Sequence, residues 1–240
     1  MQLSQDISKW IKGRVVEANK KGIVVGLSGG IDSACVAALS KKAMGLNVLG
    51  LILPCHSNSI DEELASKFAQ EFDIVTKTIP LNNIFNRIIS MFPEGSDLAR
   101  ANLKPRLRMI ALYYFANSLD YLVAGTGNKS ELCIGYFTKH GDGGVDLLPL
   151  GGLLKTEVRK LAKELGVPKE IIDRPPSAGL WKDQTDEGEM GISYEDLDLC
   201  LQAIEEKKEH IVKKEILEKT QTMIKNSRHK REKLPVFNIG

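Results

Sequence analysis

The segment Ser28–Ser33, Ser-Gly-Gly-Ile-Asp-Ser, has the residue types of an anion-binding loop. Its two glycines let the backbone approach a ligand closely, and a helix that follows would direct its first N–H groups and the positive end of its dipole at that ligand. The two serine hydroxyls can add donors. The segment therefore predicts a phosphate- or pyrophosphate-binding loop; the alternative is a tight strand-to-helix turn that binds nothing. It lacks the Gly-Lys-Ser/Thr ending of a Walker A loop, which argues against ordinary γ-phosphoryl transfer.

Asp32 is unexpected in a loop that binds phosphate alone, because a carboxylate repels a phosphate. A Mg²⁺ ion between the two groups would remove the repulsion. A second carboxylate, Glu131, closely follows another glycine-rich turn, Gly125–Gly127, which contains Thr126. We therefore expect Asp32 and Glu131 to bind one magnesium ion if their strands are neighbours. The alternative for Glu131 is a solvated glutamate at the start of a helix.

The elements that position these residues alternate between strands and helices. Short apolar runs predict buried strands at residues 23–27, 47–53 and 121–124, and a further strand is expected at 74–79. Helices are expected near the N-terminus and at residues 32–44, 61–72, 81–91 and 102–119, the last starting either at Asn102 or only after Pro105. This alternation is typical of the α/β class, with a doubly wound parallel sheet and helices on both faces. Ligands of such sheets lie beyond the carboxyl ends of the strands, so both glycine-rich turns should border one crevice.

The chain changes character after Cys133. Two polar stretches, 138–146 and 174–191, are long enough to act as lids over a site. A helix is expected between them at 155–165, and two charged helices at 193–206 and 208–224 would form a helical C-terminal extension. Since no linker divides the sequence, we expect a single domain over residues 1–240.

Several motifs together resemble the NAD⁺ synthetase family. Ser28–Ser33 resembles the pyrophosphatase loop of the ATP pyrophosphatases, which cleave ATP between its α and β phosphates. The block from Gly125 to Gly152, with Gly-Thr-Gly-Asn-Lys-Ser-Glu and Gly-Tyr-Phe-Thr-Lys-His-Gly-Asp-Gly, makes the resemblance specific. The similarity runs from about Gly22 to Pro235, with further matches at Arg106–Met109, Pro149–Leu150, Lys155, Val158–Arg159, Pro176–Trp181 and His229–Arg231.

This resemblance implies a ligase that forms a carbon–nitrogen bond in the last step of NAD⁺ biosynthesis. The nicotinate carboxylate of deamido-NAD⁺ would attack the α-phosphate of ATP, giving an adenylylated intermediate and pyrophosphate, and ammonia would then displace AMP. Mg²⁺ is the implied cofactor, and a second copy of the chain is implied as partner in a homodimer. The stretch before the first strand is too short for a glutaminase domain, so free ammonia is expected unless a separate subunit supplies it.

The resemblance also assigns residues to ligands. The ATP contacts it implies are Gly26, Leu27, Ser28, Gly29, Gly30, Ile31, Asp32, Ser33, Thr126, Lys155 and Ser177. The deamido-NAD⁺ contacts it implies are Arg106, Lys139, Asp146, His229 and Lys230. Without the family, several of these could be surface charges or a basic tail. Lys155 is expected to clamp the ATP phosphates during catalysis. Asp142 is our first choice for a general base, and the acids from Asp183 to Glu189 are alternatives.

The composition excludes other classes. Lys and Arg number 33 and Asp and Glu 31, so a net charge of +2 gives no general attraction to nucleic acid or to a membrane surface. Four cysteines without a C-x-x-C pair suggest neither a disulfide framework nor a zinc site. With no secretory signal and no apolar run approaching ~18 residues, we expect a cytoplasmic protein. Two alternatives remain open: another ATP pyrophosphatase, tRNA-modifying or GMP synthetase-like, and a non-catalytic adenine-nucleotide-binding module.

Overall fold

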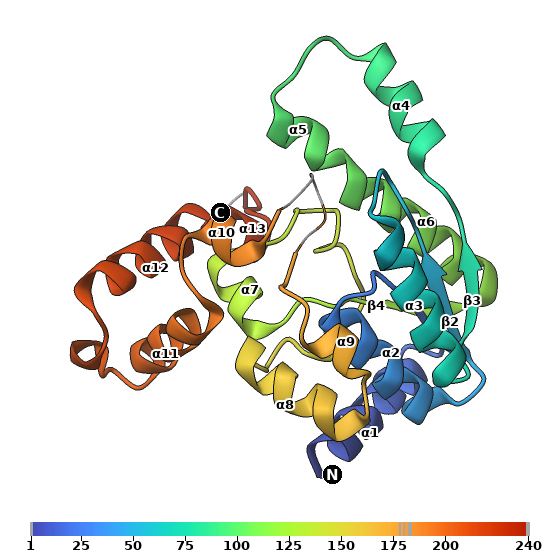
Figure 1. Ribbon diagram of the computed structural model, residues 1–240, viewed down its shortest axis with the longest axis horizontal. Coiled ribbons are helices and arrows are strands. Elements are labelled where there is room, and N and C mark those ends of the chain that lie inside the picture. The colour runs from blue at the N-terminus through green and yellow to red at the C-terminus, as the bar shows by residue number, and fades with distance from the viewer. Residues whose placement is uncertain (1, 178, 180, 182–183, 239–240) are drawn as a thin grey trace.

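Four parallel strands form the sheet in the part of the chain that the computed structural model describes, residues 2–177, 179, 181 and 184–238 (Figure 1). Their order across the sheet is β3-β2-β1-β4. The strands are β1 (Gly22–Gly26), β2 (Val48–Ile52), β3 (Val75–Thr78) and β4 (Tyr121–Ala124). Because β1 pairs with β2 on one side and β4 on the other, the chain changes direction across the sheet between β1 and β4. This is the topological switch point at which such folds bind ligands.

Helices surround the sheet and continue beyond it. They are α1 (Gln2–Glu17), α2 (Ile31–Met44), α3 (Ser59–Glu71), α4 (Asn82–Met91), α5 (Asp97–Ala101), α6 (Leu103–Leu119), α7 (Lys129–Ile134), α8 (Lys155–Leu165), α9 (Lys169–Ile172), α10 (Asp186–Met190), α11 (Tyr194–Glu205), the 3₁₀ helix η1 (Glu209–Ile211), α12 (Lys214–Asn226) and α13 (Arg228–Arg231). None of the described helices is both long and apolar enough to span a bilayer.

Both faces of the sheet are covered, as the apolar character of its central strands predicts. Ile23 and Val25 of β1 pack into a core shared with α1, α2, α3 and α8. Val24, which points to the other face, belongs to a second core with residues of α4 and α6. Successive side chains of a strand alternate between faces, so a strand that is apolar throughout requires both layers. The α/β class and the doubly wound parallel sheet are thus confirmed.

The C-terminal extension has a core of its own. Ile134 of α7, Met190 of α10 and Leu197 and Leu201 of α11 pack together, with partly buried side chains of α12 against them. Figure 1 shows α11 and α12 to one side of the sheet, with α7 and α10 between them and the strands. The fully buried Tyr194 belongs to this core. It therefore connects the extension to the centre of the molecule.

Of the two starts expected for α6, the earlier is correct within one residue, but some other expected boundaries were wrong. Helix α6 begins at Leu103 and includes Pro105 in its first turn, where the missing N–H of proline costs no hydrogen bond. A separate helix, α5, precedes it and was not expected; its N-cap is Ser96. The final charged helix starts at Lys214 rather than at residue 208, after the 3₁₀ turn η1. Short helices α9, α10 and α13 were also not expected, because four or five residues are too few to show a helical period.

Candidate active site

The loop between β1 and α2 is held in one shape by its own serines. The Ser33 hydroxyl accepts a hydrogen bond from the Ser28 backbone N–H at 3.2 Å and donates one to the Gly30 carbonyl at 2.9 Å. Gly29 has a φ of +76°, and a Cβ there would lie 2.5 Å from the Asp61 carbonyl oxygen. A side chain at this position would therefore meet both a strained backbone and a clash with α3. The loop is preformed beside the N-terminus of α2.

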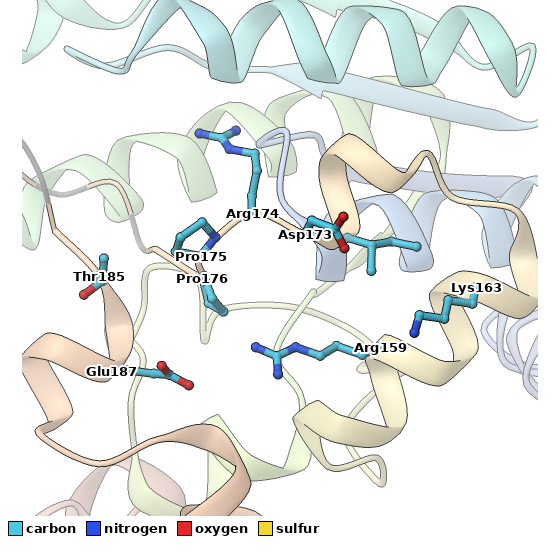
Figure 2. A pocket seen from close by; sticks show the side chains of 9 residues that line it. Arg159, Lys163, Asp173, Arg174, Pro175, Pro176, Thr185 and Glu187 are labelled. Atoms are coloured by element: carbon cyan, nitrogen blue, oxygen red, sulfur yellow. The ribbon is translucent and has the colours of Figure 1, made fainter.

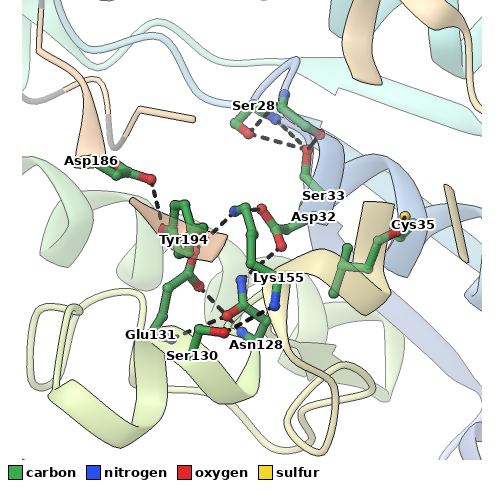
Figure 3. A network of polar contacts seen from close by, with 12 residues as sticks. Ser28, Asp32, Ser33, Cys35, Asn128, Ser130, Glu131, Lys155, Asp186 and Tyr194 are labelled. Atoms are coloured by element: carbon green, nitrogen blue, oxygen red, sulfur yellow. Dashed lines mark hydrogen bonds and ion pairs between the residues drawn. The ribbon is translucent and has the colours of Figure 1, made fainter. Parts of the chain in front are cut away.

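Lys155, the first residue of α8, places a buried ammonium group beside this loop (Figure 3). The residue is only 1% exposed. Its Nζ donates to Asp32 Oδ2 at 2.5 Å and to Glu131 Oε1 at 3.2 Å, and it lies 4.8 Å from the centre of the Tyr194 ring. A buried cation is tolerated only when it is paired in this way. The two predicted metal ligands and the predicted phosphate clamp thus meet at one nitrogen atom.

Three neighbouring segments hold this cluster. The Asn128 side-chain amide donates to Asp32 Oδ1 at 2.9 Å, which joins the turn after β4 to the turn after β1. Asn128 also caps α7, since its Oδ1 accepts from the Glu131 N–H and its own N–H donates to Glu131 Oε2. The Ser130 hydroxyl accepts from the Lys155 N–H at 2.9 Å and donates to Asp198. Both glycine-rich turns therefore border one site, as predicted.

Glu131 combines both interpretations that its sequence position allowed. It is a helix-start glutamate in a capping box, and it is also a partly buried member of the site. Burial, the largest influence, raises the pKa of its carboxyl group to about 7, although Lys155 acts in the opposite direction and Asp32 adds to the rise. For Lys155, burial alone would lower the pKa, but Asp32 and Glu131 outweigh it and raise the value above that of a free lysine.

Tyr194 and Asp186 complete the cluster, and sequence reasoning missed the first of them. The Tyr194 hydroxyl lies 3.2 Å from Glu131 Oε1 and 3.1 Å from Asp186 Oδ2. Asp186, only 4% exposed, also accepts from the Tyr136 hydroxyl at 3.2 Å. Asp186 was among the acids considered as a base. Tyr194 and Tyr136 carry no local signal of a polar role.

A cleft of about 1240 Å³ opens over the cluster. Residues predicted to bind ATP or metal that line it are Gly26, Leu27, Ser28, Gly29, Gly30, Ile31, Asp32, Ser33, Thr126, Glu131, Lys155 and Ser177. Asp142 and Lys230 also line the cleft. Four of the residues predicted to contact deamido-NAD⁺, all within the described chain, do not line it: Arg106, Lys139, Asp146 and His229.

Most of those residues contact each other instead, around the loop 135–146. Lys139 Nζ donates to the His229 carbonyl at 2.7 Å, and the Arg106 guanidinium donates to the Lys139 carbonyl at 3.4 Å. Lys230 Nζ donates to the carbonyls of Gly135 and Phe137, both at 2.9 Å. Hydrogen bonds of His229 and Lys230 therefore connect α13 to this loop.

Asp146 supports the sheet edge. Its carboxylate accepts from the Val123 N–H at 2.7 Å and from the Tyr113 hydroxyl at 2.9 Å. The first contact satisfies a backbone donor on the outer side of β4, which has no neighbouring strand there in the described sheet.

Asp142, the first choice for a general base, lines the cleft. It accepts a hydrogen bond from the Thr138 N–H at 2.9 Å. The surrounding protein raises the pKa of its carboxyl group, mainly by displacing water. Among the alternatives, Glu187 accepts from the Tyr194 N–H and Glu189 from Tyr136 and Gln184. Asp183 lies outside the described residues.

The carboxylate oxygens at the site fit Mg²⁺ bound together with a nucleotide. Two carboxylates converge on one point in the cleft wall, and Mg²⁺ takes one or two protein carboxylates plus phosphate oxygens and water. Within the described residues, no group of three or more His, Cys, Asp or Glu side chains could hold a metal without such help. Asp32 and Glu131 would supply two ligands to such an ion, and phosphate oxygens and water would supply the others.

A second pocket, of about 430 Å³, is bordered by the segment 172–176, by α8 and by Thr185 and Glu187 (Figure 2). It shares Arg174, Pro175, Pro176 and Thr185 with the cleft. Its basic side chains are largely committed, since Arg159 pairs with Glu195 and Arg174 pairs with Asp61 at 2.7 Å. The second of these ion pairs holds the start of segment 174–191 to α3, beside the loop of Gly29.

The raised pKa of Glu131 predicts a pH effect on the stability of the ligand-free chain. A carboxyl group whose pKa is about 7 when folded and about 4.5 when unfolded binds more protons in the folded state, so its contribution is present below pH 4.5 and is lost as pH rises through 7. Glu131→Gln has no such titration. Between pH 5 and pH 8, the free energy of unfolding of this variant should therefore improve relative to the parent by about 1 kcal/mol or more.

Denaturant unfolding at a series of pH values measures this difference. Glu63→Gln is the matched control, because Glu63 is exposed and its pKa is lowered by Lys67, which places its titration below this range. If the difference in free energy of unfolding between Glu131→Gln and the parent stays constant from pH 5 to pH 8, the raised pKa of Glu131 is contradicted.

Comparison with known proteins identifies the family of the chain. A family model described as NAD synthase matches residues 3–234. The NH(3)-dependent NAD(+) synthetase of Carboxydothermus hydrogenoformans is 52% identical over 200 residues, covering 81% of this chain and 82% of that protein. The protein of the same description from Finegoldia magna is 48% identical over 232 residues, covering 96% of this chain and 93% of that protein.

A solved structure with a different description has the same fold. The NMN synthetase from Francisella tularensis superimposes with a TM-score of 0.92 and 37% identity, over 99% of this chain and 98% of that chain. The resemblance inferred from the motifs is confirmed: the chain belongs to the NAD synthase family.

Proposed function

We propose that the chain catalyses the ATP-dependent amidation of deamido-NAD⁺ to NAD⁺ with ammonia, through an adenylylated intermediate. The observation that carries the proposal is the convergence of Asp32, Glu131 and Lys155 beside a preformed loop at the switch point of the sheet. A carboxylate substrate is a poor electrophile, and its activation as an adenylate requires a site that stabilises a departing pyrophosphate. A preformed loop, a helix N-terminus and a lysine suit that task.

In the first step, the chain's own groups bind and orient the triphosphate of ATP. The loop Ser28–Ser33 and the start of α2 offer N–H and hydroxyl donors to the leaving pyrophosphate. Asp32 and Glu131 would hold Mg²⁺, which when bound offsets the negative charge of the phosphates. With those carboxylates holding the ion, the ammonium group of Lys155 would be free to donate to a phosphate oxygen. Thr126 and Ser177, both in the cleft lining, are placed to contact the nucleotide.

In the second step, ammonia attacks the activated carbonyl and a proton must leave the attacking nitrogen. We propose Asp142 as the acceptor, because it faces the cleft and has a raised pKa. The loop that carries it also carries Lys139 and Asp146, and it contacts Arg106 and the His229–Lys230 tail. We propose that this region binds deamido-NAD⁺, in part outside the cleft of a single chain.

We further propose that the chain forms a homodimer through the face of α4, α5 and α6. Figure 1 shows α4 and α5 standing away from the sheet. Exposed apolar side chains lie along this face: Met91, Phe92, Leu98, Ile110 and Tyr114. Burial of such a surface in a second copy removes it from water. A location in the cytoplasm fits the four cysteines, which are free within the described chain.

Sedimentation equilibrium of the purified chain tests the homodimer. The expected mass is twice that of the chain, and Ile110→Glu should shift the equilibrium toward monomer because it places a charge in the contact. Leu46→Glu, at a more exposed site between α2 and β2, should leave the mass unchanged. A monomeric parent protein at micromolar concentration would contradict the proposal.

The activity is tested by following pyrophosphate and NAD⁺ with the purified chain, ATP, Mg²⁺ and ammonium. Both products should form with deamido-NAD⁺. In separate assays, nicotinate mononucleotide replaces deamido-NAD⁺, and glutamine replaces ammonium. Asp32→Asn should lower the rate about a hundredfold or more, because it removes a carboxylate charge that would hold Mg²⁺ beside the phosphates. The matched control is Asp73→Asn, which changes an exposed carboxylate paired with Lys41.

Two results would overturn the proposal. The first is ATP binding without pyrophosphate release in the presence of deamido-NAD⁺ and ammonium, as a non-catalytic nucleotide-binding module would give. The second is an unchanged rate in Asp32→Asn, which would remove Asp32 from the site.

A further inference from the structure

Tyr194 connects the candidate metal carboxylate to a different part of the chain. The residue is fully buried, and its hydroxyl lies within hydrogen-bond distance of Glu131 on α7 and Asp186 on α10 (Figure 3). Its ring packs below the ammonium group of Lys155 on α8. A single side chain of α11 therefore contacts charged groups from three other helices.

The hydroxyl cannot serve both carboxylates equally. A phenol has one proton to donate, and the two acceptor oxygens lie at nearly equal distances of 3.2 Å and 3.1 Å. Glu131 has another donor in Lys155 at 3.2 Å. Asp186 shares its other donor, the Tyr136 hydroxyl, with Glu189 at 2.7 Å. Whichever carboxylate lacks the Tyr194 proton is less well satisfied.

Asp186 begins α10, so its contacts decide where that helix lies. The Asp186 N–H donates to the Pro176 carbonyl at 2.9 Å, and its carboxylate joins α10 to both tyrosines. Met190 at the other end of α10 packs in the same apolar core as Tyr194. The two tyrosine hydroxyls are thus among the contacts that hold α10 at the cleft wall.

We propose that Tyr194 is a positioning residue that couples Glu131 to α10. When Glu131 turns to a cation in the cleft, the Tyr194 hydroxyl donates to Asp186 alone and holds α10 more firmly. The inference rests on the proposed function in one respect, namely that Glu131 meets a cation together with ATP. It adds a residue with no assigned role and a direction of coupling.

A purely structural role for Tyr194 predicts something different. The ring would fill the core and cover Lys155, and phenylalanine would do the same. Tyr194→Phe keeps the ring and removes only the bridging oxygen. Tyr136→Phe is the matched variant, because it removes a hydroxyl that contacts Asp186 and Glu189 without contacting Glu131.

The test compares hydrogen–deuterium exchange of the full-length chain with and without Mg²⁺ and ATP. In the parent, the amides of α10 should exchange about tenfold more slowly with both ligands present, the effect of one stronger hydrogen bond to a charged group. In Tyr194→Phe this slowing should be lost, and the half-saturating Mg²⁺ concentration should rise about tenfold, because the bound state loses that hydrogen bond. In Tyr136→Phe, α10 should exchange faster overall but should still slow on ligand binding.

The possible outcomes separate this inference from the proposed function. A Tyr194→Phe protein that matches the parent in both exchange and Mg²⁺ dependence would overturn the coupling, even if the parent makes NAD⁺. A parent whose α10 exchange is the same with and without the two ligands would also overturn it. If ligand-dependent slowing is present and lost in Tyr194→Phe, the coupling stands, whether or not deamido-NAD⁺ is the substrate.

Discussion

The ammonium group of Lys155, buried between two carboxylates, is the interaction on which the arrangement of the site depends. A lysine that is 1% exposed must have anionic partners, and here they come from residues 123 and 24 positions away in the chain. This requirement fixes the start of α8 against the first turn of α2 and the start of α7. Ser130 and Asp198 strengthen it by accepting hydrogen bonds from the first N–H groups of α8. The strand order that places β1 beside β4 makes the meeting possible.

The same pairing explains how a chain with a net charge of only +2 can hold a polyanion. In the ligand-free state the ammonium group of Lys155 is neutralised by Asp32 and Glu131. The site therefore needs no exposed basic surface. A ligand that brings both phosphates and a divalent cation can exchange partners: carboxylates turn to the cation and the lysine to the phosphates. Phosphate without a cation would have to approach Asp32 and Glu131 directly, which is unfavourable. This local balance would favour a metal–nucleotide complex over phosphate alone.

Much of this could be predicted from the sequence, because the signals are local. The loop Ser28–Ser33, the glycine turn before α7 and the apolar strands indicated the fold and placed Asp32 and Glu131 in one crevice. Lys155 was assigned to the site by resemblance, but its pairing with those carboxylates depends on tertiary position. Tyr194 could not be found, since its neighbours in sequence resemble an ordinary charged helix. Asp146 was singled out from the sequence, but one of its contacts was not predicted. Its carboxylate accepts a hydrogen bond from a backbone N–H of β4, a role that no sequence pattern indicates.

The most direct test of the partner exchange is a crystal structure of the chain with Mg²⁺ and a non-hydrolysable ATP analogue. The account predicts that Lys155 Nζ contacts a phosphate oxygen and that Asp32 and Glu131 turn their oxygens toward the metal ion. A structure in which the analogue is bound and Lys155 still donates to both carboxylates would contradict it.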